Sequence, residues 1–248
     1  MISLKKILVE GRYDSLVTKL SSECIKLVKD GYSAVADPAG EFAGKKIYYK
    51  SDETAPHITE NAFPHILFKE VENEDVPLEF YFLLKVKWDD SVDGFKYGGD
   101  AYNETSKNAA DPPLIEVRLE IEPDSYPQVL SRISMALSDV IRHEIEHITQ
   151  SGWNLKSGKY LRSDMSMRNK ISSGKKRPAE YFLLKKEIPS MIQGMYMKAK
   201  KMKRPFAEVV KDYLSYYVED NIISPVEYEK ILATWRTYLP KLGIRQEL

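Results

Sequence analysis

Residues 127–150 read PQVLSRISMALSDVIRHEIEHITQ and predict the helix around which the fold is organised. At about 100° per residue, its apolar side chains fall into one stripe. The stripe consists of Leu130, Ile133, Leu137, Ile141 and Ile148. Gly152 follows and ends the helical pattern. Because an apolar stripe must be buried against another element, we expect this helix to pack on a sheet.

The same helix carries two of the four histidines of the chain, His143 and His147. Residues four apart project from one face, about 40° apart, so both imidazoles can reach a single Zn²⁺ ion. Glu144 stands next to His143, where a carboxylate can act as a general base. The alternative is a solvated helix face of His and Glu residues. The sequence therefore predicts zinc as cofactor, with His143 and His147 as ligands and Glu144 as catalytic base.

A third protein ligand is needed to complete such a site. No histidine follows His147 in the chain, so a downstream acid is indicated. The candidates are Asp164, Glu180 and Glu187. Asp164 falls in a polar, basic segment over residues 151–178 that predicts a long loop, and Glu180 stands at its exit. We prefer Glu187, since apolar residues on both sides can hold its carboxylate rigidly.

Strands are predicted upstream of the motif helix. Residues 78–88 are rich in aromatic and branched side chains, and residues 114–122 alternate apolar and charged side chains. Such alternation is typical of a strand at or near a sheet edge. Residues 98–104, with Gly98 and Gly99, are expected to form a loop or an edge. Further helices are expected over residues 13–30, 181–201, 205–220 and 225–239, the last with Ser224 as its cap.

The motif His143-Glu144-x-x-His147, followed by Glu187 at a helix start, resembles the gluzincin class of zinc peptidases, which use two His and one Glu. The stretch Leu114–Ile121 is similar to the edge strand that pairs with an extended substrate in those folds. More narrowly, Tyr181 through Glu187-Ile188 and residues 7–16 resemble metallopeptidases encoded by tailed bacteriophages. The sequence departs from these patterns at Glu146, which is charged, and at Ser190, where a small apolar residue is common.

We therefore expect an α+β, zincin-like fold, with a twisted sheet packed on the active-site helix and a helical C-terminal part. The expected domains are an N-terminal helical extension over residues 1–32, a catalytic domain over 33–204, and C-terminal helices over 205–248. The 248 residues suffice for a substantial core. Tyr102, Tyr160 and Tyr181 are each candidate donors to the oxyanion of a tetrahedral intermediate.

Composition limits the location and the partners. No apolar run is long enough to span a membrane, and the first residues lack the features of a secretory signal. The single cysteine, Cys24, is expected to be buried, and a reducing compartment fits best. We expect a cytoplasmic protein, located in the host cytoplasm or in a virion if the chain is phage-encoded. Residues 1–150 carry a net charge of −10 and residues 151–204 one of +12, so an acidic partner or nucleic acid could bind the basic stretch.

Zinc-dependent hydrolysis of peptides or proteins is the leading function. One alternative is a structural or assembly protein, associated with a virion, that retains the zinc site without peptidase activity. Another is a nucleic-acid-associated protein that uses the basic stretch 151–204. The sequence does not name a substrate.

Overall fold

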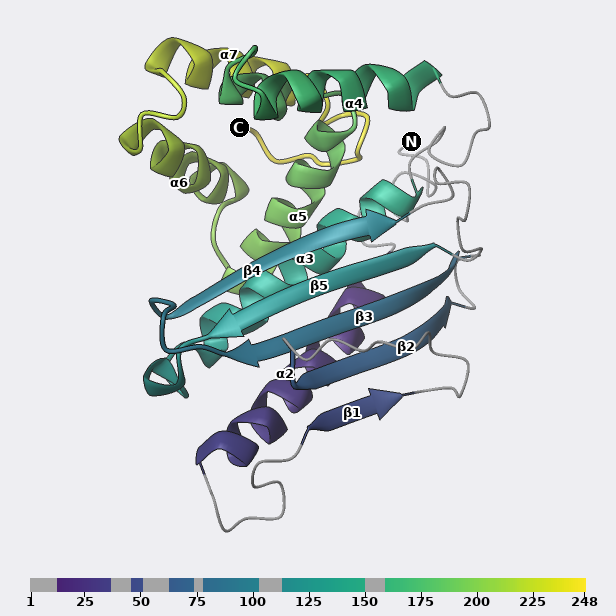
Figure 1. Ribbon diagram of the computed structural model, residues 1–248. Helices are drawn as coiled ribbons and strands as arrows, with labels where there is room; N and C mark the ends of the chain where they lie inside the picture. The colour runs from purple at the N-terminus through teal and green to yellow at the C-terminus, as the bar shows by residue number, and fades with distance from the viewer. Residues whose placement is uncertain (1–12, 37–45, 51–62, 74–77, 103–112, 150–158) are drawn as a thin grey trace. The chain divides into compact units, whose positions relative to one another are not determined.

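The computed structural model describes residues 13–36, 46–50, 63–73, 78–102, 113–149 and 159–248. The chain divides into two compact units. The sheet unit comprises residues 15–144, and the helical unit comprises residues 145–248 together with residues 1–14. The boundary falls within one continuous helix, α3 (Leu130–Thr149) (Figure 1). The domain limits expected at residues 32 and 204 stay a prediction.

The sheet unit is built on five strands in the order β1-β2-β3-β5-β4. Their bounds are β1 Ile47–Lys50, β2 His65–Asn73, β3 Leu78–Trp88, β4 Phe95–Tyr102 and β5 Leu114–Ile121. β1 and β2 are parallel, as are β3 and β5, whereas β2 runs antiparallel to β3 and β4 antiparallel to β5. A short 3-10 turn, η1 (Pro123–Ser125), follows β5. The expected α+β class is thus confirmed.

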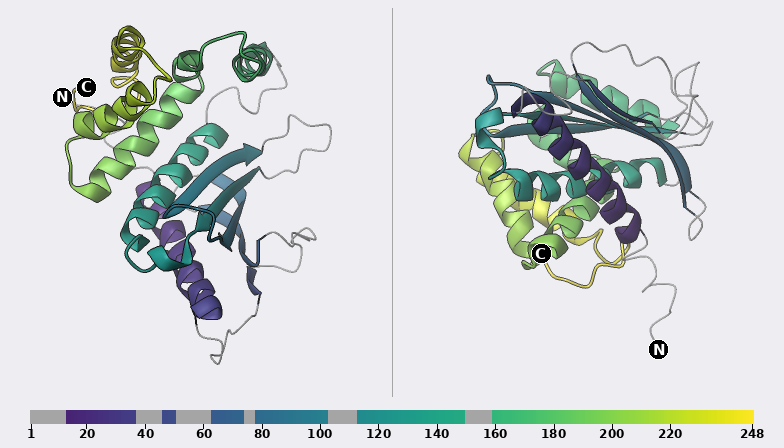
Figure 2. Two further views of the ribbon diagram at one scale, coloured as in Figure 1. Left: turned by 60° about the vertical axis from the view of Figure 1, so that its left-hand side comes forward. Right: turned by 90° about the horizontal axis from the view of Figure 1, so that it is seen from below.

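One face of this sheet carries the core of the unit. The helix α2 (Asp14–Ala36) and the helix α3 both lie against it (Figure 2). The register of β3 and β5 places Phe82 beside Ile115 and Leu84 beside Val117, all fully buried. Fully buried helix residues complete this core: Val17, Cys24, Leu27, Val28, Ile133, Leu137 and Ile141. The apolar stripe predicted for α3 is therefore the face that meets the sheet.

Close contacts fix α2 within the unit. The hydroxyl groups of Ser21 and Ser138 are 2.9 Å apart and hydrogen-bond α2 to α3. A Cβ atom at Gly31 would lie 2.9 Å from Cδ2 of His65, so only a glycine lets the helix approach β2 this closely. His65 is 2% exposed, so its imidazole is part of the packing between α2 and β2. Burial lowers its pKa, because the charged imidazolium loses its hydration.

The edge strands of the sheet are β1 and β4, and β5 lies next to β4. The resemblance to gluzincins suggested that Leu114–Ile121 forms the edge, but β5 lies between β3 and β4. The charged residues of β5 are not all in water: Glu116 is 9% exposed and its Oε2 lies 3.2 Å from Nζ of the buried Lys85. Because the two charges pair across neighbouring strands, an alternating charged sequence fits an interior strand.

Among its described residues, the helical unit contains four further helices and a 3-10 turn. These are α4 (Lys159–Ser172), η2 (Pro178–Leu183), α5 (Glu187–Met202), α6 (Phe206–Glu219) and α7 (Pro225–Arg236). Their core includes Ile192, Phe206, Val210, Leu214, Ile231 and Trp235, all fully buried. The indole Nε1 of Trp235 donates a 2.8 Å hydrogen bond to the carbonyl of Phe182, which joins α7 to η2.

Two local predictions for this unit had different outcomes. Ser224 caps α7 as expected: its hydroxyl accepts from the amide of Glu227, whose carboxylate accepts from the amide of Ser224 at 2.8 Å. The long loop expected over residues 151–178 is wrong, because residues 159–172 form α4. The many Ser, Lys and Arg residues of α4 leave it without a continuous apolar stripe, which hid the helix.

Several cations of the basic stretch have acidic partners. Lys200 lies 2.9 Å from Asp14, and Arg177 lies 3.0 Å from Glu227.

In the part of the chain that the structure describes, no helix has both the length and the apolar character that crossing a membrane requires.

Candidate metal centre

The centre begins on α3, where one helical turn separates His143 from His147. His143 is half-buried, while Glu144 is 5% exposed and His147 is 4% exposed. Burial of the polar side chains of Glu144 and His147 is costly unless each has a polar partner. Glu146, which departs from the usual motif, is only half-buried.

The predicted third ligand, Glu187, is the first residue of α5 and is fully buried. Its neighbour Ile188 and the next-turn residue Met191 belong to the core of the helical unit. These contacts hold the start of α5, and with it the carboxylate. Glu187 is therefore packed between apolar residues, as expected from the sequence.

Glu187 faces His147. Oε2 of Glu187 lies 3.5 Å from Nε2 of His147. Two donors bound at about 2.0–2.1 Å in a tetrahedral site are roughly 3.3 Å apart, so this separation suits a shared metal ion. One ligand atom from each of His143, His147 and Glu187 lies within 4.8 Å of the others. The three residues form a group that can hold a metal ion.

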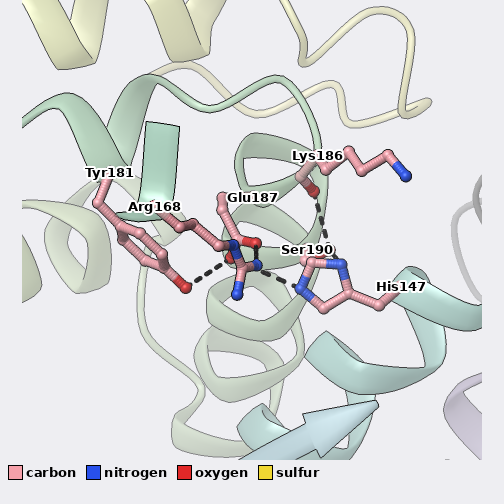
Figure 3. Close-up of polar contacts among 6 residues, drawn as sticks. All are labelled: His147, Arg168, Tyr181, Lys186, Glu187 and Ser190. Carbon is pink, nitrogen blue, oxygen red and sulfur yellow. Dashed lines mark hydrogen bonds and ion pairs between the residues drawn. The ribbon is translucent and has the colours of Figure 1, made fainter. Parts of the chain in front are cut away.

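A hydrogen-bond chain orients the ring of His147 (Figure 3). Oγ of Ser190 lies 3.2 Å from Nδ1 of His147 and also 3.2 Å from the carbonyl oxygen of Lys186. The carbonyl can only accept, so the single hydroxyl proton of Ser190 goes to it. Ser190 then accepts a hydrogen bond from Nδ1–H of His147. This tautomer leaves the lone pair on Nε2, the nitrogen that faces Glu187.

Two further side chains hold the Glu187 carboxylate. The hydroxyl of Tyr181 donates a 2.7 Å hydrogen bond to Oε2, and the guanidinium of Arg168 pairs with Oε1. Arg168 also lies over the ring of Tyr181, 5.6 Å from its centroid. Figure 3 shows both side chains pointing to Glu187 from outside α5. The negative charge of a buried carboxylate is thereby compensated.

Arg168 could not be identified from the sequence, because it stands in the segment expected to be a loop. Ser190 departs from the motif pattern of the resembling peptidases, yet it contacts His147 directly. Tyr181, one of three candidate oxyanion donors, directs its hydroxyl to Glu187 instead. Tyr102 is an exposed residue of β4, and the side chain of Tyr160 lies outside the described residues.

The competing acids are placed differently. Glu180 lies in η2 and is half-buried, and among the described residues the metal-ligating group includes Glu187 and not Glu180. Asp164 lies in α4, with its side chain outside the described residues.

Comparisons of this chain with protein-family models, with curated proteins and with solved structures found no match.

Proposed function

We propose that this chain is a zinc-dependent hydrolase of peptides or proteins. The observation that carries the proposal is the position of Glu187. A fully buried carboxylate lies 3.5 Å from the imidazole of His147, one turn along α3 from His143. Two neighbouring histidines and a carboxylate forty residues further along the chain thus form a mixed nitrogen and oxygen group.

The donor set fits Zn²⁺. Two neutral imidazoles and one carboxylate are the ligands of one class of catalytic zinc site. Structural zinc sites use four protein ligands, whereas catalytic sites use three and leave a position open. The group within the described residues has three members, which supports a catalytic site over a purely structural one. When bound, the ion would supply Lewis acidity for the attack of water on a carbonyl group.

The residues of the chain would divide the remaining tasks. Glu144, next to the ligand His143, would take a proton from the attacking water and pass it to the leaving amine. Ser190 would hold His147 in the tautomer that presents Nε2. Tyr181 and Arg168 would hold the Glu187 carboxylate in place.

Metal analysis of the protein purified without added zinc, combined with a peptide-library assay, tests the proposal. We expect about one zinc per chain and hydrolysis at neutral pH. His143→Ala and His147→Ala should each abolish zinc binding, because two of three donors do not form a stable site. Zinc content that is unchanged in either variant would overturn the assignment of these ligands. Iron in place of zinc would overturn the assignment of the metal.

Glu144→Gln separates catalysis from metal binding. The variant should retain zinc and lose turnover by several orders of magnitude, since the amide cannot accept the proton. Glu146→Gln, two residues further on the same helix, is the matched control and should retain both. If the wild-type protein binds zinc but hydrolyses no peptide of the library, the site serves structure or assembly and the hydrolase proposal fails.

A further inference from the structure

Two adjacent glycines of the edge strand β4 have different surroundings. A Cβ atom built on Gly98 meets nothing within 4 Å. A Cβ atom built on Gly99 would lie 2.5 Å from Cγ2 of Val140, 2.8 Å from Oε1 of Glu144 and 3.0 Å from Cγ of Glu144. Carbon atoms pack best at about 3.5–4.0 Å, so position 99 has no room for a side chain.

The register of the sheet explains the difference. Gly99 pairs with Val117, which is fully buried on the face that α2 and α3 cover. Gly98 pairs with Arg118, whose side chain is 46% exposed on the opposite face. Because side chains alternate along a strand, position 99 faces α3 and position 98 faces away.

Position 99 faces the helix at Val140 and Glu144. These two residues are four apart and therefore lie on the same face of α3. They are 8% and 5% exposed. Val140 is branched at Cβ and has one strongly preferred rotamer in a helix, whereas Glu144 has three flexible torsions. An added methyl group at position 99 would therefore displace the flexible Glu144 carboxylate, and its 2.5 Å contact with Val140 would also require a local shift between β4 and α3.

We propose that Gly99 is a positioning residue for Glu144. The missing side chain lets the carboxylate lie against the backbone of β4, and the strand limits where it can move. The inference rests on the proposed function, in which Glu144 is the general base. It goes beyond that function because it assigns the edge strand β4 a role in positioning the Glu144 carboxylate.

The expected consequence is kinetic. A general base must lie within about 2.6–3.2 Å of the proton it takes, and a displacement of about 1 Å can cost 10²-fold in rate. Gly99→Ala should therefore lower kcat by roughly 10- to 100-fold. Its zinc content should be unchanged, because the three atoms nearest to the added Cβ belong to Val140 and Glu144 and not to a ligand histidine. KM should change little, since substrate binding does not need the proton transfer.

Gly98→Ala is the matched control, because it makes the same change one residue away in open space. It should retain wild-type kcat. In the Glu144→Gln background, Gly99→Ala should cause no further loss of turnover, because the displaced group no longer acts as a base. Equal kcat for Gly98→Ala and Gly99→Ala, or a full further loss in the Glu144→Gln background, would overturn the proposal.

A second pair of variants keeps the test valid if Gly99→Ala does not fold. Val140→Ala removes the Cγ2 atom that lies nearest to position 99. Gly99→Ala combined with Val140→Ala leaves Glu144 as the group in conflict, so its kcat should still fall below that of Val140→Ala alone. Equal values in these two variants would contradict the inference.

Crystal structures separate the inference from the hydrolase proposal. If the wild type hydrolyses nothing, the proposed function fails, but the position of the Glu144 carboxylate can still be compared between the wild type and Gly99→Ala. A carboxylate displaced by about 1 Å, beside an unmoved His143, supports the positioning role. A carboxylate that superimposes in the two structures excludes it.

Discussion

The hydroxyl of Ser190 links Nδ1 of His147 to the main-chain carbonyl of Lys186, with both distances at 3.2 Å. All three residues are buried. Since the carbonyl takes the hydroxyl proton, the direction of the second hydrogen bond is set, and so is the tautomer of the imidazole. A residue that the motif does not include thereby decides which nitrogen of His147 is available to a metal ion.

Ser190→Ala should weaken zinc binding by about 10-fold, a typical cost of losing an outer-shell partner of a ligand histidine. The Kd for zinc, measured by competition with a chelator, gives the effect. ¹⁵N chemical shifts of His147 in the metal-free protein should show a mixture of tautomers in the variant and one tautomer in the wild type. Ser172→Ala, which removes another hydroxyl bonded to a main-chain carbonyl, should change neither. An unaltered Kd in Ser190→Ala would show that the hydrogen bond does not hold the ligand.

Glu187→Gln should weaken zinc binding by at least 10-fold, because a neutral amide oxygen replaces a carboxylate donor. Glu180→Gln makes the same change in the half-buried acid of η2 and should leave the Kd nearly unchanged. Both variants are measured by the same chelator competition. A weaker site in Glu180→Gln, with Glu187→Gln at the wild-type value, would reverse the choice of the third ligand.

The sequence predicts some parts of the candidate site and of the fold and leaves others undetected. The spacing of His143 and His147 predicted a shared metal, and the apolar residues around Glu187 predicted a rigid acid. The sequence could not indicate Arg168, because a helix without an apolar stripe looks like a loop. Alternation placed residues 114–122 at or near an edge, and β5 is the neighbour of the edge strand β4; the edge position itself, implied by the resemblance to gluzincins, was wrong, and the buried pair of Lys85 and Glu116 shows how an interior strand can alternate.

The buried His65 should make the sheet unit less stable in mild acid. Its pKa in the folded protein is lowered by burial, while the unfolded chain has the ordinary value of about 6.5. Above pH 6.5 the imidazole is neutral in both states, and its contribution to stability is fully present. As the pH falls below 6.5, the unfolded state binds a proton that the folded state does not, so the free energy of unfolding decreases.

Chemical denaturation between pH 7.5 and pH 5 measures this effect. His65→Leu should reduce the slope of the unfolding free energy against pH, by up to the amount that corresponds to one bound proton. The ring protons of His65 should show no titration in NMR spectra over the upper part of that range. A His65 resonance that titrates with a midpoint near 6.5 would contradict the assignment.

Ser224→Ala should destabilise the helical unit by about 1 kcal/mol, the typical cost of losing an N-cap. The loss removes one half of the reciprocal bonds with Glu227, and the amide of Glu227 has lost its acceptor. Urea unfolding followed by circular dichroism gives the free energy. Thr234→Ala, which removes a hydroxyl bonded within the same helix, is the control and should not lower the free energy of unfolding. A fall of the same size in both variants would show that the cap adds nothing specific.

The reactivity of Cys24 can report how often α2 opens away from the rest of the sheet unit. Cys24 is the single thiol of the chain, it is fully enclosed between α2 and the rest of the core, and burial raises its pKa. A thiol reagent can therefore modify the protein only in the rare moments when α2 leaves its place. The rate of labelling, compared with that of a free thiol, reports how often this happens without any engineered probe. The same rate, followed in the variants at positions 31, 65 and 138, would show which contact of the helix limits its opening.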